Sequence, residues 1–149
     1  MNSQDKPQVL LDLGLSDAER ILGEWARYED LLYARNELMN LTRVPREEAF
    51  ARHFVDCVLF HRLIPDGAEV LDVGTGPGFP AVPLAIARPD LKLTALDSSG
   101  KMLGFLREAV QALSLSIQVV QERVEDWKVR EAFDVVTGRA VAPLAVQVE

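Results

Sequence analysis

The stretch LDVGTGPGFP, residues 71–80, decides the fold of this chain. It places three glycines within five residues, directly behind the short apolar run that ends at Val73. A strand that leads into a glycine-rich turn and then a helix is typical of parallel βαβ units, in which the turn approaches a ligand with its main chain. The pattern therefore raises the question of which ligand this turn holds.

The segments that flank the turn alternate between strand and helix patterns. Apolar runs predict strands at 69–73, 91–97, 117–120 and 133–137, and helical spacing predicts helices at 80–88 and 99–113. Strands that alternate with helices form parallel βαβ units. The sequence therefore predicts an α/β fold, a doubly wound parallel sheet with four readable strands in the order 3-2-1-4.

A helical cap precedes the first strand. Ser16 and Glu19 form a capping-box pattern, and apolar residues then recur at helical spacing to about residue 38. Pro45 opens a second predicted helix, whose apolar face consists of Phe50, Phe54, Val58, Leu59 and Leu63. We assign residues 1–64 to this N-terminal helical cap and residues 65–149 to the ligand-binding half of one compact unit.

Composition narrows the class of protein. The 149 residues are 48% apolar and 26% charged, which fits one globular domain. The start has no apolar signal segment, and the longest apolar run, 79–87, is shorter than the ~20 residues of a membrane span, so we expect a cytoplasmic protein without membrane contact. A single Cys57 excludes an internal disulfide, and with only two histidines beside it we expect no metal site.

The net charge of −7 argues against indiscriminate nucleic-acid binding, which depends on lysine and arginine. Residues 35–62 nevertheless carry five arginines against four acids. This segment is either a basic side that faces a polyanion or an ordinary solvated helix face.

Three classes of ligand can be tested against the glycine turn. A triphosphate loop requires a Gly-Lys-Ser/Thr ending, and no lysine lies between residues 71 and 91. The dinucleotide pattern G-x-G-x-x-G requires glycine at position 79, where this chain has Phe79. What remains is G-x-G-x-G, preceded by Asp72 and followed about 20 residues later by Asp97, where a carboxylate usually accepts ribose hydroxyls.

S-adenosylmethionine fits this arrangement better than a dinucleotide does. It has no phosphate to cradle, and its sulfonium and ammonium groups suit a turn lined by Asp72 and main-chain groups. Two alternatives stay open at this point: a dinucleotide-binding redox or sensor domain, and a non-catalytic S-adenosylmethionine-binding module.

Motifs along most of the chain carry a resemblance. They are NLTRV at 40–44, RHFVDC at 52–57, the segments 71–90 and 93–115, RVED at 123–126 and FDVVTGRAVAPL at 133–144. Their combination resembles the rRNA small-subunit methyltransferase G family, also called glucose-inhibited division protein B. The resemblance implies a Rossmann-like class I S-adenosylmethionine-dependent methyltransferase fold. It also implies methyl transfer to N7 of a guanine in small-subunit (16S) ribosomal RNA.

The resemblance also implies roles for single residues. Gly74, Thr75, Gly76, Gly78 and Phe79 would surround the methionine and ribose, Asp97 and Ser98 would meet the ribose, and Arg123, Val124 and Glu125 would hold the adenine. Arg139, in TGRA, would act in transfer or target placement. The implied partner is 16S rRNA in the small ribosomal subunit or an assembly intermediate, bound by a monomer.

The proposed acceptor explains why no catalytic constellation is discernible. Guanine N7 has an in-plane lone pair and no proton, so its methylation needs positioning and no general base. On the cap, His53 and Asp56 share a helix face. They are either a helix pair that fixes the cap, or Arg52 and His53 lie at the rim of the cofactor cleft and bind the incoming RNA.

The end of the sequence suggests truncation. Val141, Leu144, Ala145 and Val148 follow helical spacing, so we expect residues after 137 to form a turn and the start of a helix that is cut in mid-pattern. The fourth strand would then lack a neighbour. On this interpretation the chain binds its cofactor and is poor at catalysis.

Overall fold

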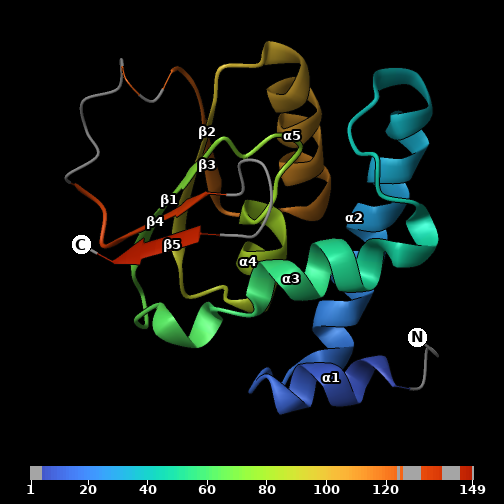
Figure 1. The fold of residues 1–149 in the computed structure, drawn as a ribbon, viewed down its shortest axis with the longest axis vertical. Coiled ribbons are helices and arrows are strands. Elements are labelled where there is room, and N and C mark those ends of the chain that lie inside the picture. Colours follow the sequence, from blue (N-terminus) through green and yellow to red (C-terminus); the bar gives the residue numbers. More distant parts are fainter. Residues whose placement is uncertain (1–4, 124, 126–131, 139–144, 149) are drawn as a thin grey trace.

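A five-stranded sheet forms the centre of the computed structural model, which describes residues 5–123, 125, 132–138 and 145–148 (Figure 1). The strands lie in the order β3-β2-β1-β4-β5, so β1 is central and the predicted order 3-2-1-4 is confirmed. They are β1 (Glu69–Val73), β2 (Lys92–Asp97), β3 (Ile117–Gln121), β4 (Val135–Gly138) and β5 (Ala145–Val148).

The first four strands are parallel, and their register brings the ends of β1 and β2 together. Asp72 pairs with Ala95 of β2 on one side and with Thr137 of β4 on the other. Because parallel strands end at the same edge of a sheet, Val73 and Asp97 open onto a common rim. The glycine turn begins at this rim.

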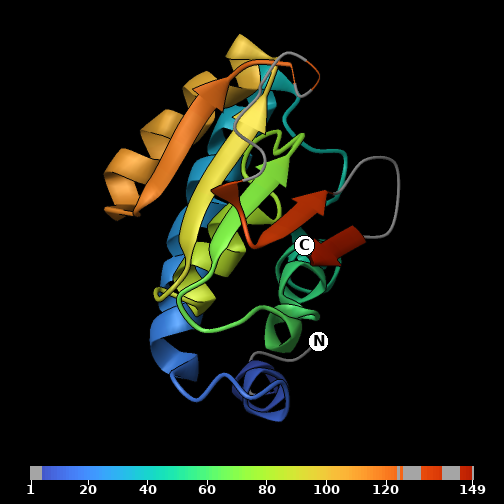
Figure 2. The same ribbon diagram turned by 90° about the vertical axis from the view of Figure 1, so that its left-hand side faces the viewer.

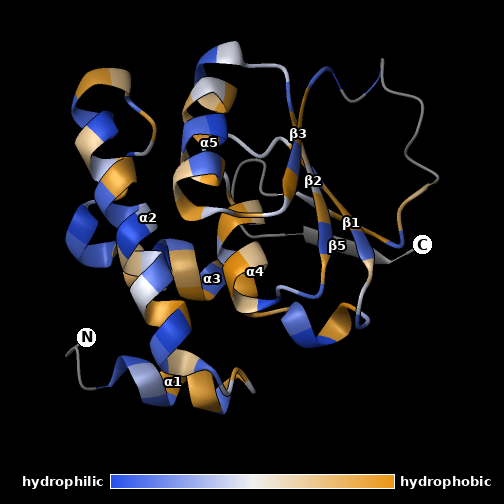
Figure 3. Cartoon of the chain, turned by 180° about the vertical axis from the view of Figure 1, so that it is seen from behind, coloured by the Kyte–Doolittle hydropathy of each residue, from blue (hydrophilic) through white to orange (hydrophobic). Residues whose placement is uncertain are grey.

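Two helices cover one face of the sheet. Helices α4 (Ala81–Ala87) and α5 (Gly100–Leu113) lie behind the strands in Figure 2. Ser99 caps α5, because its hydroxyl accepts a hydrogen bond of 3.2 Å from the Met102 amide. Helix α4 is mainly hydrophobic (Figure 3), since it is enclosed between the sheet and the cap.

The cap forms two hydrogen bonds to α4 and one to the turn that precedes it. It contains α1 (Lys6–Asp12) and α2 (Ala18–Met39). From α2, Arg20 donates to the Ile86 carbonyl at 2.9 Å, Trp25 to the Pro83 carbonyl at 3.3 Å, and Tyr28 to the Pro77 carbonyl at 2.6 Å. The cap and the sheet thus share one hydrophobic core.

The prediction of one continuous second helix in the cap is wrong. The segment contains a 3₁₀ turn, η1 (Arg46–Glu48), a π-helix, η2 (Phe50–Val55), one α-turn, α3 (Asp56–Val58), and a second 3₁₀ turn, η3 (His61–Leu63). Phe50, Phe54 and Val58 are buried as expected, but Leu59 is 48% exposed and Leu63 is 62% exposed. A π-turn inserts an additional residue, so the residues beyond it leave the 3.6-residue period.

Two other expectations are also wrong. Helix α2 begins after Asp17 without a side-chain capping bond, so the Ser16–Glu19 box does not form. The expected C-terminal helix is replaced over Ala145–Val148 by β5, which pairs antiparallel with β4. An unpaired edge of β4 would present main-chain donors and acceptors, and the antiparallel pairing with β5 satisfies them.

No helix in the described part of the chain is long and apolar enough to cross a membrane.

Three glycines allow a matched test of helix propensity against turn geometry. A Cβ added to Gly23 in α2 or to Gly104 in α5 would have no neighbouring atom within 4 Å. A Cβ added to Gly78 would lie 2.6 Å from the Val82 side chain, and the φ of Gly78 is +124°. We expect Gly23→Ala and Gly104→Ala each to raise the free energy of unfolding by about 0.5–1 kcal/mol, and Gly78→Ala to lower it by 1 kcal/mol or more, roughly. Urea unfolding measures all three. A stabilising Gly78→Ala would contradict this geometry.

Candidate functional site

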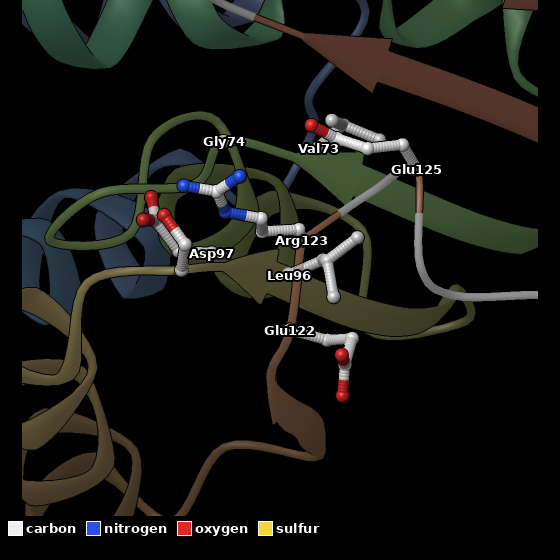
Figure 4. Close-up of a pocket in the computed structure, with 8 residues that line it drawn as sticks. Val73, Gly74, Leu96, Asp97, Glu122, Arg123 and Glu125 are labelled. Atoms are coloured by element: carbon white, nitrogen blue, oxygen red, sulfur yellow. The ribbon is translucent and has the colours of Figure 1, made fainter.

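A pocket of about 390 Å³ lies where β1, β2 and β3 end (Figure 4). Its described lining consists of Val73, Gly74, Leu96, Asp97, Ser98, Glu122, Arg123 and Glu125. Three of these side chains carry carboxylates and one carries a guanidinium group. The lining is therefore net acidic, which suits a ligand with positive charge.

The main chain of the glycine turn forms one wall of this pocket. The amides of Gly74 and Thr75 both donate to the Leu96 carbonyl, at 2.8 and 3.1 Å. Gly74 and Gly76 have φ values of +70° and +58°, and a Cβ at either position would meet open space. Glycine supplies this conformation without strain and leaves the space beside the turn free for a ligand.

Asp97 is fixed directly beside the glycine turn. Its Oδ2 accepts a hydrogen bond of 2.8 Å from the Gly76 amide, and its Oδ1 accepts one of 2.9 Å from the Ser99 amide. A carboxylate has about four lone-pair sites, so acceptor capacity remains on both oxygens. The arrangement provides a preorganised acceptor for ligand hydroxyl groups.

Figure 4 shows how the charged side chains lie around the pocket. Arg123 extends toward Asp97 and Gly74, Glu125 lies beside Val73, and Glu122 points away from them. The described residues that follow β3 thus line the pocket next to the glycine turn.

The structure brings only some of the predicted cofactor residues to the lining. Gly74, Asp97, Ser98, Arg123 and Glu125 line the pocket. Asp72, Thr75, Gly76, Gly78 and Phe79 belong to the strand and turn that support it but are not part of the described lining. Val124 and Arg139 lie outside the described residues.

Asp72 is fully buried beneath the turn. Its Oδ2 accepts from the Ala81 amide and its Oδ1 from the Thr137 hydroxyl, both at 3.2 Å. Burial raises the pKa of this carboxyl to about 8, against the opposing effect of the hydrogen bonds from the Thr137 hydroxyl and the Ala81 amide. Asp72 therefore connects β1 to the start of α4 and to β4.

The two predicted RNA-binding residues lie in different environments. Arg52 is exposed and forms an ion pair of 3.1 Å with Glu48. His53 is 6% exposed and its ring stacks on Phe79. Cys57, the only cysteine, is also buried. In the part of the chain that the structure describes, no group of three His, Cys, Asp or Glu side chains could hold a metal ion.

Sequence reasoning missed Tyr28 and Thr42, which support the site from the cap. Tyr28 holds the Pro77 carbonyl within the turn, and the Thr42 hydroxyl contacts His53. Each of these residues has a hydroxyl group that could have drawn attention. The helical spacing of the apolar residues already accounted for Tyr28, however, and the composition of the loop accounted for Thr42. Their contacts join residues 49 and 11 positions apart, which no local pattern reveals.

Comparison with known proteins gives one consistent result. The sequence profile described as rRNA small subunit methyltransferase G matches residues 22–149. Curated proteins named ribosomal RNA small subunit methyltransferase G are 36% identical in Leuconostoc mesenteroides, over all of this chain and 66% of that protein, and 42% identical in Clostridium perfringens, over 80% and 53%. The chain thus spans about half to two thirds of the length of these relatives.

Solved structures support the fold independently. A Plasmodium falciparum structure described as a putative protein-L-isoaspartate O-methyltransferase in complex with S-adenosyl-L-homocysteine matches with a TM-score of 0.56 at 14% identity. The match covers 95% of this chain and 75% of that one. The predicted Rossmann-like class I methyltransferase fold is confirmed.

The raised pKa of Asp72 predicts a specific dependence of stability on pH. Between about pH 4 and 8 the folded state keeps this proton while the unfolded state, with a pKa near 3.8, loses it, so stability falls as pH rises. Asp72→Asn cannot ionise. We expect its free energy of unfolding, relative to the wild type, to improve by up to ~1.4 kcal/mol per pH unit from pH 5 to 8.

Asp90→Asn is the matched control. Arg88 lowers the pKa of Asp90 to about 2, so this carboxylate is ionised in both states above pH 5. Its variant should differ from the wild type by a constant amount over the same range. Urea unfolding at four pH values measures both differences, and a flat difference for Asp72→Asn would refute the raised pKa.

Proposed function

We propose, for a chain that belongs to the rRNA small subunit methyltransferase G family, that its pocket binds S-adenosylmethionine and that the protein methylates N7 of a guanine in 16S ribosomal RNA. The observation that carries the proposal is the Asp97 carboxylate, which is fixed beside an open glycine turn in a pocket with a net acidic lining. The carboxylate suits ribose hydroxyls, and the net acidic lining suits the positively charged methionine portion.

The residues present fit this cofactor one part at a time. Asp97 and Ser98 would hold the ribose, and the main chain at Gly74 and Gly76, where no Cβ fills the space, would lie beside the methionine. Arg123 and Glu125, with Val124 between them, would flank the adenine. We propose that Asp72, Thr75, Gly78 and Phe79 shape the turn from below.

The chemistry asks little of the protein beyond placement. When bound, S-adenosylmethionine supplies an electrophilic methyl group, and guanine N7 offers a lone pair that no base must uncover. Holding the methyl donor and the acceptor in line can lower the activation barrier by about 7–11 kcal/mol. We assign Arg139 to transfer or target placement, and the division into a cap, 1–64, and a cofactor-binding half, 65–149, remains our assignment.

The partner would be 16S rRNA, in the small subunit or an assembly intermediate, met by a cytoplasmic monomer. We place its contact at Arg52, on the exposed side of η2. The basic count of residues 35–62 overstates the available charge, because Arg35, Arg46 and Arg52 form ion pairs with carboxylates. RNA phosphates would compete with these exposed pairs, which are individually weak.

Cofactor binding tests the site directly. Asp97→Ala should weaken S-adenosylmethionine binding by ~1.5–3 kcal/mol, about ten- to hundredfold, because it removes hydrogen bonds to a charged acceptor. Asp134→Ala is the control, since that carboxylate also accepts a main-chain amide, from Glu69, at the opposite edge of the sheet. Calorimetric titration measures both variants. Binding of NADH and not of S-adenosylmethionine would contradict the proposed function and would favour a dinucleotide-binding redox or sensor domain.

Methyl transfer tests the activity. With isolated small subunits as substrate, we expect slow formation of 7-methylguanosine in the 16S rRNA, measured by mass spectrometry. Arg139→Ala should reduce this rate at least about a hundredfold, with less than threefold change in cofactor affinity, the pattern of a group that acts only in the transition state. Arg107→Ala, an exposed arginine on α5, should leave both unchanged. If the wild type binds the cofactor but transfers no methyl group, the result contradicts the proposed activity and favours a non-catalytic S-adenosylmethionine-binding module.

A further inference from the structure

A hydrogen bond between Thr42 and His53 joins two distant segments of the cap. The Thr42 hydroxyl lies 2.7 Å from Nε2 of His53. Thr42 itself is held, because its amide donates to Oδ1 of Asn36 at 2.8 Å and its hydroxyl accepts from the Val44 amide at 3.1 Å. The position of the His53 ring is therefore set by a loop that is fixed to α2.

The same His53 ring lies flat against Phe79 of the glycine turn. The ring centroids are 4.2 Å apart and the planes differ by 7°. Tyr28 and Phe54 contact Phe79 through near-perpendicular ring pairs, at 5.7 and 6.2 Å. Among the described ring contacts of Phe79, the one with His53 is face to face, so it restrains the plane of the Phe79 ring.

Main-chain bonds lead from Phe79 to the pocket. The amides of Phe79 and Gly78 donate to the Thr75 carbonyl at 2.9 and 3.0 Å. The Thr75 amide donates to the Leu96 carbonyl, and the next amide, that of Gly76, donates to Asp97. A displacement of Phe79 would thus reach the two walls of the pocket through consecutive hydrogen bonds.

We propose that Thr42 and His53 are positioning residues that hold the glycine turn in its ligand-binding conformation. This inference rests on the proposed function, because it takes the pocket to be the S-adenosylmethionine site. Neither residue lines the pocket. Both act through Phe79, and a turn held in place before binding leaves less ordering to be done when the ligand arrives.

A purely space-filling role would not require this pair of residues. A phenyl ring could fill the volume of the imidazole and stack on Phe79 equally well. The hydrogen bond between the His53 ring and the Thr42 hydroxyl offsets part of the cost of placing these polar groups beside aromatic rings. The hydrogen bond adds a second point of attachment, which fixes the rotation of the His53 ring about its stacking axis.

Substitutions at Thr42 test the proposal without touching the pocket. Thr42→Val keeps the side-chain shape and removes the hydroxyl, and Thr42→Ser restores the hydroxyl. With S-adenosylhomocysteine as the probe and the whole 149-residue chain, Thr42→Val should raise the Kd about two- to fivefold, because a smaller fraction of the protein has a competent turn. Its binding entropy should become less favourable, since binding now orders the turn. Thr42→Ser should restore both values.

A second substitution separates this path from general destabilisation. His53→Phe keeps the stack and removes Nε2, so we expect it to weaken binding as Thr42→Val does. In the double variant the two effects should be less than additive, because both substitutions remove the Thr42–His53 hydrogen bond, while Thr42→Val also removes the acceptor of the Val44 amide. Additive losses in Kd would overturn the proposal, as would a lowered melting temperature of Thr42→Val with an unchanged Kd.

The stack can be measured without any ligand. In proton NMR spectra the imidazole protons of His53 should be shifted upfield by the Phe79 ring and should move downfield in Phe79→Leu, with His61 as the internal reference. Unshifted His53 protons overturn this inference alone. A wild-type chain that shows the shift but binds no S-adenosylhomocysteine overturns the proposed function and, with it, the role assigned to Thr42 and His53.

Discussion

The hydrogen bonds between the glycine turn and the end of β2 are the constraint on which the site depends. Two amides, from Gly74 and Thr75, share the Leu96 carbonyl, and a third, from Gly76, binds Asp97. These bonds turn the chain away from the sheet at the end of β1 while keeping its main chain beside β2. A pocket forms because glycine puts no side chain into the space that this path leaves open.

The other side of the turn is held by side chains that replace a helical hydrogen bond. Helix α4 begins at Ala81, so the Ala81 amide and the Pro77 carbonyl, four residues earlier, have no partner within the helix. Asp72 of β1 accepts from the Ala81 amide, and Tyr28 of α2 donates to the Pro77 carbonyl. The strand and the cap thereby satisfy both groups. This explains why a buried carboxyl and a buried phenol are tolerated there.

Local patterns in the sequence predicted the central sheet well. The run before Gly74 and the spacing to Asp97 identified β1, β2 and the turn, because glycine conformation and strand alternation are properties of neighbouring residues. The cap was predicted less well, since the π-turn at Phe50–Val55 changes the period on which the prediction of Leu59 and Leu63 rested. Strand β5 was missed because its pairing with β4 is a tertiary contact that outweighs helical spacing.

The location of the predicted site residues in the structure followed the same division. Asp97 and Gly74 could be found from their order along the chain, and the family resemblance supplied Ser98, Arg123 and Glu125. The buried location of Asp72 and His53 could not be predicted in this way, because the local sequence does not show whether a polar side chain will be buried or will line the pocket. Both residues sit in motifs typical of binding, and both point into the protein.

The adjacent positions of Arg52 and His53 connect the two ligands of the proposed reaction. On η2, Arg52 is exposed beside Glu48, while His53 is buried against Phe79. The two proposals together imply that RNA at Arg52 and cofactor at the glycine turn act on one short segment. Coupling between binding sites is reciprocal, so any effect of RNA on the position of η2 must appear equally as an effect of the cofactor on RNA affinity.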